Sequence, residues 1–344
     1  MKPSAVPVRF LLVGCGTIGD RHAQLASSLG QLVAVCDLVP LRARRFSQRF
    51  ECYGYTSLDE MLRQQTGADV LIVCTPNGLH AAHSIAGLKK GLHVLCEKPM
   101  ALRSSDARNM IAAANKAGKH LVVVKQNRFN PPVAAVKQLL DKGKLGQVYS
   151  IQVNCFWNRN KRYYTHSDWK GTKELDGGVL FTQFSHFADL LWWFFGGIAS
   201  VKGFVANRGH QSITEVEDTG VFSFVTHQQV PGTFHYTTNA CNKNYEGSVT
   251  LFAEKGTIKI GGPYLNTIEY QEPVLINPGK LEPGGSANTY QGYAGSMNNH
   301  AQVYRELLQL IQGQQNRTTR GEEGLESVVL MEQFYKAAGI TGRR

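Results

Sequence analysis

Short apolar runs alternate with longer amphipathic stretches through the first third of the chain. The runs are rich in β-branched residues, which is typical of buried strands, and they cover 9–13, 32–37, 70–74, 93–97 and 121–125. Helical periodicity fills the intervals, near 18–29, 40–49, 57–65, 79–90 and 104–117. Because strands that alternate with helices form βαβ crossovers, the pattern predicts an α/β fold whose first domain, residues 1–127, has a doubly wound parallel sheet.

The pattern changes after the paired prolines Pro131 and Pro132. A helix near 133–142 and a long strand near 147–156 precede a strongly apolar helix that follows Gly177-Gly178. Alternating residues then predict strands at 199–206, 216–226, 233–240, 247–253 and 256–260, with Glu254-Lys255-Gly256 as a hairpin turn. Residues 128–344 are therefore expected to form an α+β domain with a large, open, mainly antiparallel sheet.

The end of the chain combines a loop with two helices. Residues 274–296 are rich in Pro, Gly, Ser and Asn and are expected to form the loop. Amphipathic helices are predicted near 298–313 and 321–338. Asn299-His300 opens the first of these helices, and we expect the pair to cap it in preference to facing a cleft.

Length and hydropathy bound the class of protein. At 344 residues the chain exceeds the usual size of one hydrophobic core, so two domains are expected. No apolar stretch reaches the ~18 residues that a membrane span needs. The first apolar run leads straight into a glycine turn, unlike the core of a cleavable signal peptide. We therefore expect a cytoplasmic protein without a membrane partner.

Cysteine usage and charge exclude further classes. The seven cysteines contain no C-x-x-C pair, so neither a disulfide framework nor a zinc cluster is indicated and no metal is expected. The net charge of +11 comes from dispersed Lys and Arg, and no nucleic-acid-binding signature accompanies them. The positive charge can be explained by an anionic small substrate or equally by its contribution to solubility. Nucleic acid is not expected as a partner.

A glycine-rich turn, Gly14-x-Gly16-x-x-Gly19, joins the first predicted strand to the first helix. In dinucleotide-binding domains the first glycine permits the tight turn, the second lets the backbone approach a pyrophosphate, and the third lets the helix pack on the strand. The first helical turn, with Thr17 and Ile18, offers free amide donors to the phosphates. In this context the motif predicts a Rossmann domain.

Asp37 ends the next predicted strand, where a carboxylate can accept hydrogen bonds from both hydroxyls of a ribose. The same carboxylate would repel a 2′-phosphate. NAD is therefore favoured over NADP, although Arg42 and Arg44 keep NADP open. Two later loops open at the same edge of the sheet: Thr75-Pro76-Asn77, which by itself merely suits a turn, and the loop that begins at Lys98.

Four motifs in this order resemble the glucose-fructose oxidoreductase/inositol dehydrogenase (Gfo/Idh/MocA) family. They are Gly14-x-Gly16-x-x-Gly19-x-x-His22, Cys74-Thr75-Pro76-Asn77-x-x-His80, Gly91-Leu92-His93-Val94-Leu95-Cys96-Glu97-Lys98-Pro99, and Gly177-Gly178-Val179-Leu180 through His186. The resemblance implies an NAD-binding Rossmann domain, a second domain for substrate and oligomer contacts, an active site between them, and a homodimer or homotetramer. It adds Thr75, Pro76, Asn77, His80, Glu97 and Lys98 to the expected cofactor site.

The resemblance also implies two catalytic residues, Lys98 and His186, and a Lys98–Pro99 peptide that is cis. One position departs from the family pattern. Members like inositol dehydrogenase usually carry Asp four residues before the histidine, where this chain has Thr182. A threonine is no acid or base near neutral pH, so Lys98 and His186 are expected to carry the proton. Asp189 is expected either to orient the imidazole or to pair with an arginine.

The segment from Phe156 to Gly171 resembles family members that oxidise C3 of UDP-N-acetylhexosamines or their uronic acids. Arg159, Tyr163 and Tyr164 are the candidate contacts, since clustered cationic side chains suit a diphosphate and a carboxylate. The expected activity is transfer of hydride from the sugar carbon to the nicotinamide of NAD. Three alternatives stay open: a dehydrogenase of free polyols or monosaccharides, an NAD-dependent glycosidase, and a non-catalytic regulator that senses NAD.

Overall fold

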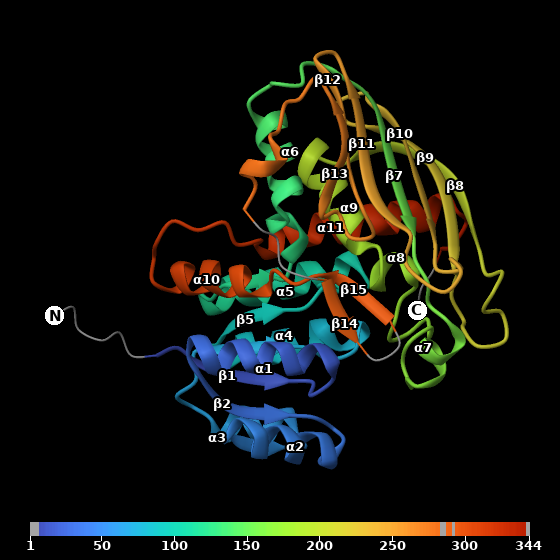
Figure 1. The fold of residues 1–344 in the computed structure, drawn as a ribbon. Helices are drawn as coiled ribbons and strands as arrows, with labels where there is room; N and C mark the ends of the chain where they lie inside the picture. Colours follow the sequence, from blue (N-terminus) through green and yellow to red (C-terminus); the bar gives the residue numbers. More distant parts are fainter. Residues whose placement is uncertain (1–6, 283–286, 291–292, 342–344) are drawn as a thin grey trace. The chain divides into compact units, whose positions relative to one another are not determined.

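The computed structural model describes residues 7–282, 287–290 and 293–341, and the chain divides into two compact units (Figure 1). The first unit contains the residues up to Val124 together with His300–Leu325. The second contains Lys125–Asn299 and the residues from Glu326 onward. The chain therefore returns to its first unit after it has built most of the second.

The first unit contains a six-stranded parallel sheet in the order β3-β2-β1-β4-β5-β6. Its strands are β1 (Arg9–Val13), β2 (Gln31–Cys36), β3 (Tyr53–Tyr55), β4 (Val70–Val73), β5 (His93–Cys96) and β6 (Leu121–Val123). The crossover helices are α1 (Thr17–Leu29), α2 (Pro40–Phe50), α3 (Leu58–Gln64), α4 (His80–Lys89) and α5 (Ser104–Ala117). The doubly wound sheet is confirmed, and the strand order reverses between β1 and β4, where such folds bind ligands.

Helix α10 (His300–Ile311) joins this unit from the far end of the sequence. Its buried residues include His300, Val303, Tyr304 and Leu307, spaced three and four apart, so one face of the helix is covered. The ring of Tyr304 packs 5.8 Å from that of Phe10 on β1. The predicted amphipathic helix is thus present, and it brings polar side chains to the Rossmann sheet.

The second unit contains a seven-stranded sheet in the order β13-β12-β11-β7-β10-β9-β8. Its strands are β7 (Val148–Phe156), β8 (Ile198–Ala206), β9 (Thr219–Thr226), β10 (Pro231–Thr237), β11 (Glu246–Ala253), β12 (Gly256–Gly261) and β13 (Thr267–Glu272). β7 and β10 pair in parallel and the other neighbours are antiparallel. Ala253 pairs with Gly256, which confirms the hairpin at 254–256.

One face of this sheet is covered by helices. Phe334 of α11 (Gly321–Ala337) packs against Phe222, Phe224 and Phe234, and α9 (Ser185–Phe195) lies along the same face in Figure 1. The remaining helices of this unit are α6 (Pro131–Asp141), α7 (Lys161–Thr165) and α8 (Val179–Thr182). No helix among the described residues is long and apolar enough to cross a membrane.

Three expectations need correction. The strongly apolar helix is broken into α8 and α9, because the amide of Phe184 bonds to the carbonyl of Val179 and the side chain of Gln183 turns to Arg159. The expected loop at 274–296 contains two paired strands, β14 (Ala287–Tyr290) and β15 (Tyr293–Met297). Its residues 283–286 and 291–292 lie outside the described residues. The sequence pattern also missed β3, which has three residues, and β13; neither strand carries a buried apolar stripe.

Candidate active site

The three glycines after β1 differ in what surrounds them. Gly14 has φ +99°, and a Cβ there would lie 2.5 Å from the carbonyl of Cys74. At Gly19 a Cβ would lie 2.0 Å from the carbonyl oxygen of Gly14. At Gly16 it would meet nothing within 4 Å. The fold itself requires Gly14 and Gly19, whereas Gly16 faces open space that a ligand can occupy.

Asp37 connects the end of β2 to this turn. Its carboxylate accepts from the amides of Cys15 and Val39, each at 2.9 Å. A carboxylate has about four acceptor sites, so capacity remains for ribose hydroxyls. Thr17 and Ile18 lie in the first turn of α1, whose amides point away from the helix and suit phosphate oxygens. The residues present therefore fit an NAD molecule.

The loop after β4 is fixed by His80. The ring places Nδ1 2.6 Å from the carbonyl oxygen of Pro99 and Nε2 2.8 Å from that of Thr75. Burial lowers the pKa of His80, and the two carbonyl contacts oppose that shift. Pro76 precedes a short 3-10 turn that begins at Asn77, which is buried. His80 thus ties together the loops after β4 and β5, and contact of these residues with the cofactor stays a prediction.

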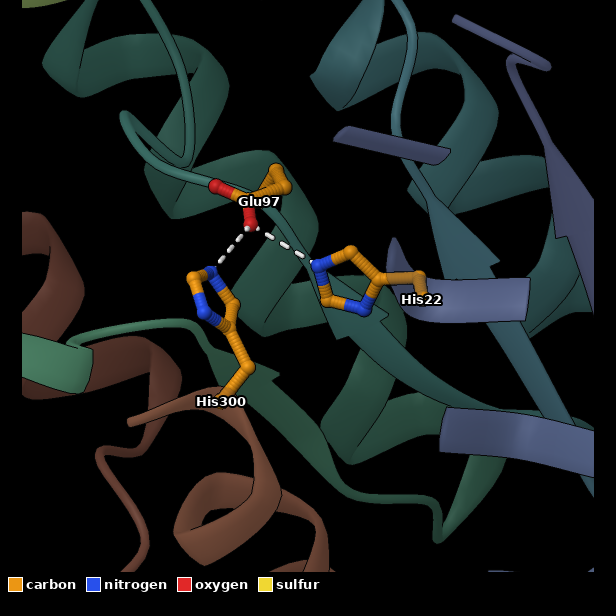
Figure 2. A group of neighbouring side chains, drawn as sticks. All are labelled: His22, Glu97 and His300. Carbon is orange, nitrogen blue, oxygen red and sulfur yellow. Dashed lines mark hydrogen bonds and ion pairs between the residues drawn. The ribbon is translucent and has the colours of Figure 1, made fainter. Parts of the chain in front are cut away.

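Glu97 forms a buried cluster with two histidines at the end of β5 (Figure 2). Its Oε1 lies 2.8 Å from His22 Nε2 and 3.5 Å from His300 Nε2. Its Oε2 accepts from the backbone amide of Lys98 at 3.0 Å. The Lys98–Pro99 peptide is cis, as the family resemblance implied. The His300 ring is directed at Glu97, and the Asn299 side-chain amide donates to Asn130. The capping role expected of Asn299-His300 stays a prediction.

The cluster fixes the charge of its carboxylate. Burial alone would raise the pKa of Glu97, but the hydrogen bond from His22 and the nearby ring of His300 outweigh it and hold that pKa well below its usual range. Burial lowers the pKa of His300, and Glu97 opposes that shift. Near neutral pH the cluster therefore contains an ionised carboxylate and a neutral His300.

Asp189 in the second unit is held by cations. Arg128 donates to both carboxylate oxygens at 2.9 Å, and Lys125 Nζ lies 3.3 Å from Oδ1. Burial would raise the pKa of Asp189, but Arg128 and Lys125 overcome it and lower that pKa. Of the two expectations for Asp189, pairing with an arginine is confirmed.

His186 is buried near the start of α9. The side-chain nitrogen of Gln126 lies 3.4 Å from His186 Nε2 and donates to Ser296 at 2.9 Å. Gln126 belongs to a 3-10 turn that the sequence analysis did not single out. The proposed catalytic histidine is thus packed against a polar side chain from a different element.

Thr182 has a carboxylate partner after all. Its hydroxyl donates to Asp176, which also accepts from the amides of Gly171 and Gly178 at 2.7 and 3.3 Å. Burial raises the pKa of Asp176, and these hydrogen bonds oppose the shift. The Asp176 carboxylate therefore lies next to Thr182, the position where the family resemblance implies an Asp in members like inositol dehydrogenase.

Arg159 and Tyr163 share one polar cluster. Arg159 is 2% exposed and donates to Gln183 at 2.7 Å, while Gln183 donates to the Tyr163 hydroxyl at 2.7 Å. Lys170 Nζ lies 3.9 Å from the centre of the Tyr163 ring. Burial and the nearby Arg159 lower the pKa of Lys170 to about 8. Tyr164 is buried and packs on His210, and substrate contact by any of these residues stays a prediction.

Two family models match consecutive parts of the chain. The NAD-binding Rossmann fold of an oxidoreductase family matches residues 8–125, and the GFO/IDH/MocA C-terminal domain matches residues 133–259. The chain belongs to the GFO/IDH/MocA oxidoreductase family. The family resemblance inferred from the four motifs is confirmed, and the first unit is an NAD-binding domain.

Solved structures of this family extend over nearly the whole chain. The WlbA dehydrogenase from Chromobacterium violaceum, solved with NADH and UDP-GlcNAcA, is 34% identical, has a TM-score of 0.88, and is matched over 98% of this chain and 95% of its own. The WlbA dehydrogenase from Bordetella pertussis, also with NADH and UDP-GlcNAcA, is 33% identical with a TM-score of 0.85, over 97% and 98% of the two chains.

Curated family members match over less of their length. D-glucoside 3-dehydrogenase from Escherichia coli is 31% identical over 42% of this chain and 42% of its own. The chain spans about two fifths of the length of this relative and of a dehydrogenase from Comamonas testosteroni that is 35% identical.

Several residues around the predicted site residues were not predicted as part of the site. Gln126, Asp176, Lys170, Gln183 and His300 contact predicted site residues, and Tyr304 contacts His22 of the first motif. Gln126, Gln183, His300 and Tyr304 lie 20 or more residues from their partners, so no local periodicity links them. Lys170 lies seven residues from Tyr163. Asp176 is also close to its partner Thr182, and its acidic side chain directly before Gly177-Gly178 was a visible signal.

Proposed function

We propose that this chain is an NAD-dependent dehydrogenase that oxidises the C3 hydroxyl of UDP-GlcNAcA, the uronic acid of UDP-N-acetylglucosamine. One observation carries the proposal: the match at 34% identity along 98% of the chain to a dehydrogenase solved with NADH and that nucleotide sugar. The name of the E. coli glucoside 3-dehydrogenase supports carbon 3 as the site of oxidation.

The reaction removes a hydride and a proton from one sugar carbon and its hydroxyl. NAD supplies the hydride acceptor at C4 of its nicotinamide. Lys98 would hold the hydroxyl oxygen and stabilise the negative charge that develops on it. His186 would accept the proton, since imidazole has an intrinsic pKa near the working pH. The variants Lys98→Met and His186→Asn, described below, test the role of each residue separately.

The polar cluster around Arg159 supports an anionic substrate. A guanidinium and an ammonium within one partly buried group suit the diphosphate or the carboxylate of a nucleotide sugar uronate. Gln183 and Tyr163 are connected to Arg159 by hydrogen bonds, so they would hold the guanidinium in a fixed orientation. We assign this cluster to recognition of the charged part of the substrate.

A free polyol is the second candidate substrate. The Asp176 carboxylate beside Thr182 could support the proton relay that polyol dehydrogenases build with their own Asp. Because burial raises the pKa of Asp176, the group could exchange a proton nearer to neutral pH than an ordinary aspartate. Activity with myo-inositol in place of the nucleotide sugar would favour this candidate.

The outer face of the seven-stranded sheet supports a homo-oligomer. Three large aromatic side chains are exposed there: Phe204 on β8, Phe252 on β11 and Tyr270 on β13. Register places Phe204 beside Val221 and Tyr270 beside Lys259, on the face opposite the Phe334 contacts. An aromatic sheet face is typical of subunit contacts, and we propose a dimer or tetramer. Light scattering of the purified protein would measure its mass, and a monomer would refute this assignment.

The activity is tested with Lys98→Met and His186→Asn on UDP-GlcNAcA, UDP-N-acetylglucosamine, myo-inositol and an aryl glycoside. We expect reduction of NAD with the uronate, and a loss of turnover of about 10²–10⁴-fold in each variant. Lys116→Met, which changes an exposed lysine of α5, is the matched control and should keep wild-type turnover. Dissociation constants for NAD should stay within twofold. Unchanged turnover in Lys98→Met would refute its role.

A further inference from the structure

The His22–Glu97–His300 cluster borders the proposed catalytic lysine, yet the reaction described above gives it no task. All three side chains are buried, with His22 at 0% and His300 at 1% exposure. Burying an ionised carboxylate is costly unless it is hydrogen-bonded. The contacts of Glu97 with His22 and His300 stabilise its negative charge directly beside Lys98, so we asked what these contacts do for the lysine.

The chemistry of the groups fixes the direction of the hydrogen bonds. An ionised carboxylate only accepts, so His22 Nε2, 2.8 Å away, carries a proton and donates it to Glu97. The other ring nitrogen of His22 lies 2.8 Å from the hydroxyl of Tyr304. Tyr304 is the fifth residue of α10, so this helix supports His22 from behind.

His300, the first residue of α10, approaches the same carboxylate oxygen. Its ring nitrogens make no hydrogen bond of good geometry to the described residues, and Nε2 lies 3.5 Å from Glu97 Oε1. Figure 2 shows both rings converging on that oxygen from different elements. The opposite oxygen of Glu97 receives the backbone amide of Lys98. A continuous set of contacts thus runs from α10 through Glu97 to the lysine.

A metal ion is the competing explanation for three buried ligand atoms. Two ligand atoms on one zinc ion, each about 2.0–2.1 Å from the metal, lie roughly 3.3 Å apart in tetrahedral geometry. His22 Nε2 and Glu97 Oε1 are 2.8 Å apart, which is the separation of a hydrogen bond. The distance favours a shared proton over a shared metal.

We propose that His22, His300 and Tyr304 are positioning residues, which fix the Glu97 carboxylate so that Glu97 fixes the backbone amide of Lys98. Helix α10 would thereby set where the lysine ammonium stands. The inference rests on the proposed catalytic role of Lys98. It has a functional consequence because misplacing a reacting group by about 1 Å can cost up to ~10²-fold in rate.

The test compares His300→Leu with His300→Gln. Leucine removes the ring nitrogen that lies 3.5 Å from Glu97 Oε1, and we expect kcat to fall about 10–100-fold, as for other residues that orient a functional group. The dissociation constants for NAD and UDP-GlcNAcA should stay within about twofold of wild type because neither ligand is held by His300. Glutamine restores a side-chain N–H and should bring kcat back to within about threefold of wild type.

The matched control is His93→Gln on β5, whose ring stacks on His120 at 4.9 Å. It should keep the wild-type kcat. The inference is overturned if His300→Leu also keeps it, or if Leu and Gln lower kcat equally, since ring volume would then matter and the N–H would not. Stoichiometric zinc in the purified wild-type protein, lost in His300→Leu, would overturn it in favour of a metal site.

A second variant keeps the test decisive if His300→Leu does not fold. Tyr304→Phe removes only the hydroxyl and keeps the ring that packs on Phe10. The hydroxyl contacts His22 Nδ1 at 2.8 Å and the His22 carbonyl oxygen at 3.3 Å, so we expect kcat to fall roughly 3–10-fold when both contacts are lost. An unchanged kcat would contradict the inference.

Lys98→Met separates failure of this inference from failure of the proposed function. If Lys98→Met is inactive while His300→Leu and Tyr304→Phe turn over like wild type, only the positioning role falls. If Lys98→Met turns over normally, the catalytic role of the lysine falls with it.

Discussion

Lys170 is the residue that most directly couples pH to substrate binding in this account. Its amine is close to the Tyr163 ring, and burial together with Arg159 lowers its pKa to about 8. The ammonium is therefore present below pH 8 and is lost as the pH rises through 8. If the amine holds the diphosphate or carboxylate, an anionic substrate binds more weakly above that pH.

We expect the dissociation constant for UDP-GlcNAcA to rise about tenfold between about pH 7 and about pH 9, the loss of one charge-assisted hydrogen bond. Isothermal titration calorimetry at both values measures it. Lys170→Met should bind weakly at both, whereas Lys116→Met, which alters an exposed lysine of α5 outside the segment Phe156 to Gly171, should keep the wild-type dependence. A dissociation constant that is equal at the two pH values would remove Lys170 from the substrate site.

At the residue scale, the sequence revealed those site residues that belong to local motifs. Gly14 and Asp37 follow strands directly and Lys98 is the second residue after β5, so their neighbourhood in the fold can be inferred from the order of elements. His300 reaches Glu97 from a helix that begins about two hundred positions later. Nothing in its local sequence distinguishes a partner of a buried carboxylate from a helix cap.

At the scale of the β1–α1 element, Gly16 and Gly19 should respond to alanine in opposite ways. A Cβ at Gly19 would overlap the carbonyl of Gly14, so Gly19→Ala should lower the free energy of unfolding by about 1–3 kcal/mol. A Cβ at Gly16 meets open space, so Gly16→Ala should keep the wild-type stability. It should nevertheless weaken NAD binding at least ~10-fold, because the backbone can no longer approach the pyrophosphate.

Thermal unfolding and NAD titration of the two variants check this pair. Each variant serves as the control for the other, since they alter the same turn by the same methyl group. A lowered melting temperature in Gly16→Ala with normal NAD affinity would place the cofactor elsewhere.

The elements themselves were predictable where burial gives them a regular pattern. β4 and β5 are fully or nearly fully buried apolar runs, and the strands β9 and β10 alternate regularly between buried and partly exposed positions. β13 was missed because none of its residues is buried and the exposed Glu269, Tyr270 and Glu272 obscure the alternation. The break between α8 and α9 was missed because it depends on Gln183 bonding to Arg159, a contact between separate elements.

At the scale of the whole molecule, the two sheet types followed from the change of pattern after Pro131-Pro132. The assignment of helices to the two units did not follow from the sequence pattern. Helix α10 has one buried face, which predicts that it packs on something, but amphipathicity does not identify the sheet that receives it. The return of α10 to the Rossmann unit is what makes His300 and Tyr304 available to Glu97.

The central claim is hydride transfer from C3 of a nucleotide sugar uronate to NAD, and a single-turnover label experiment tests it most directly. The enzyme is mixed with NAD and a limiting amount of UDP-GlcNAcA that carries deuterium at C3, and the reduced nucleotide is examined by mass spectrometry and NMR. We predict one deuterium per reduced nicotinamide, at C4. Reduced nicotinamide without deuterium, or no reduction of NAD by this substrate, would contradict the account.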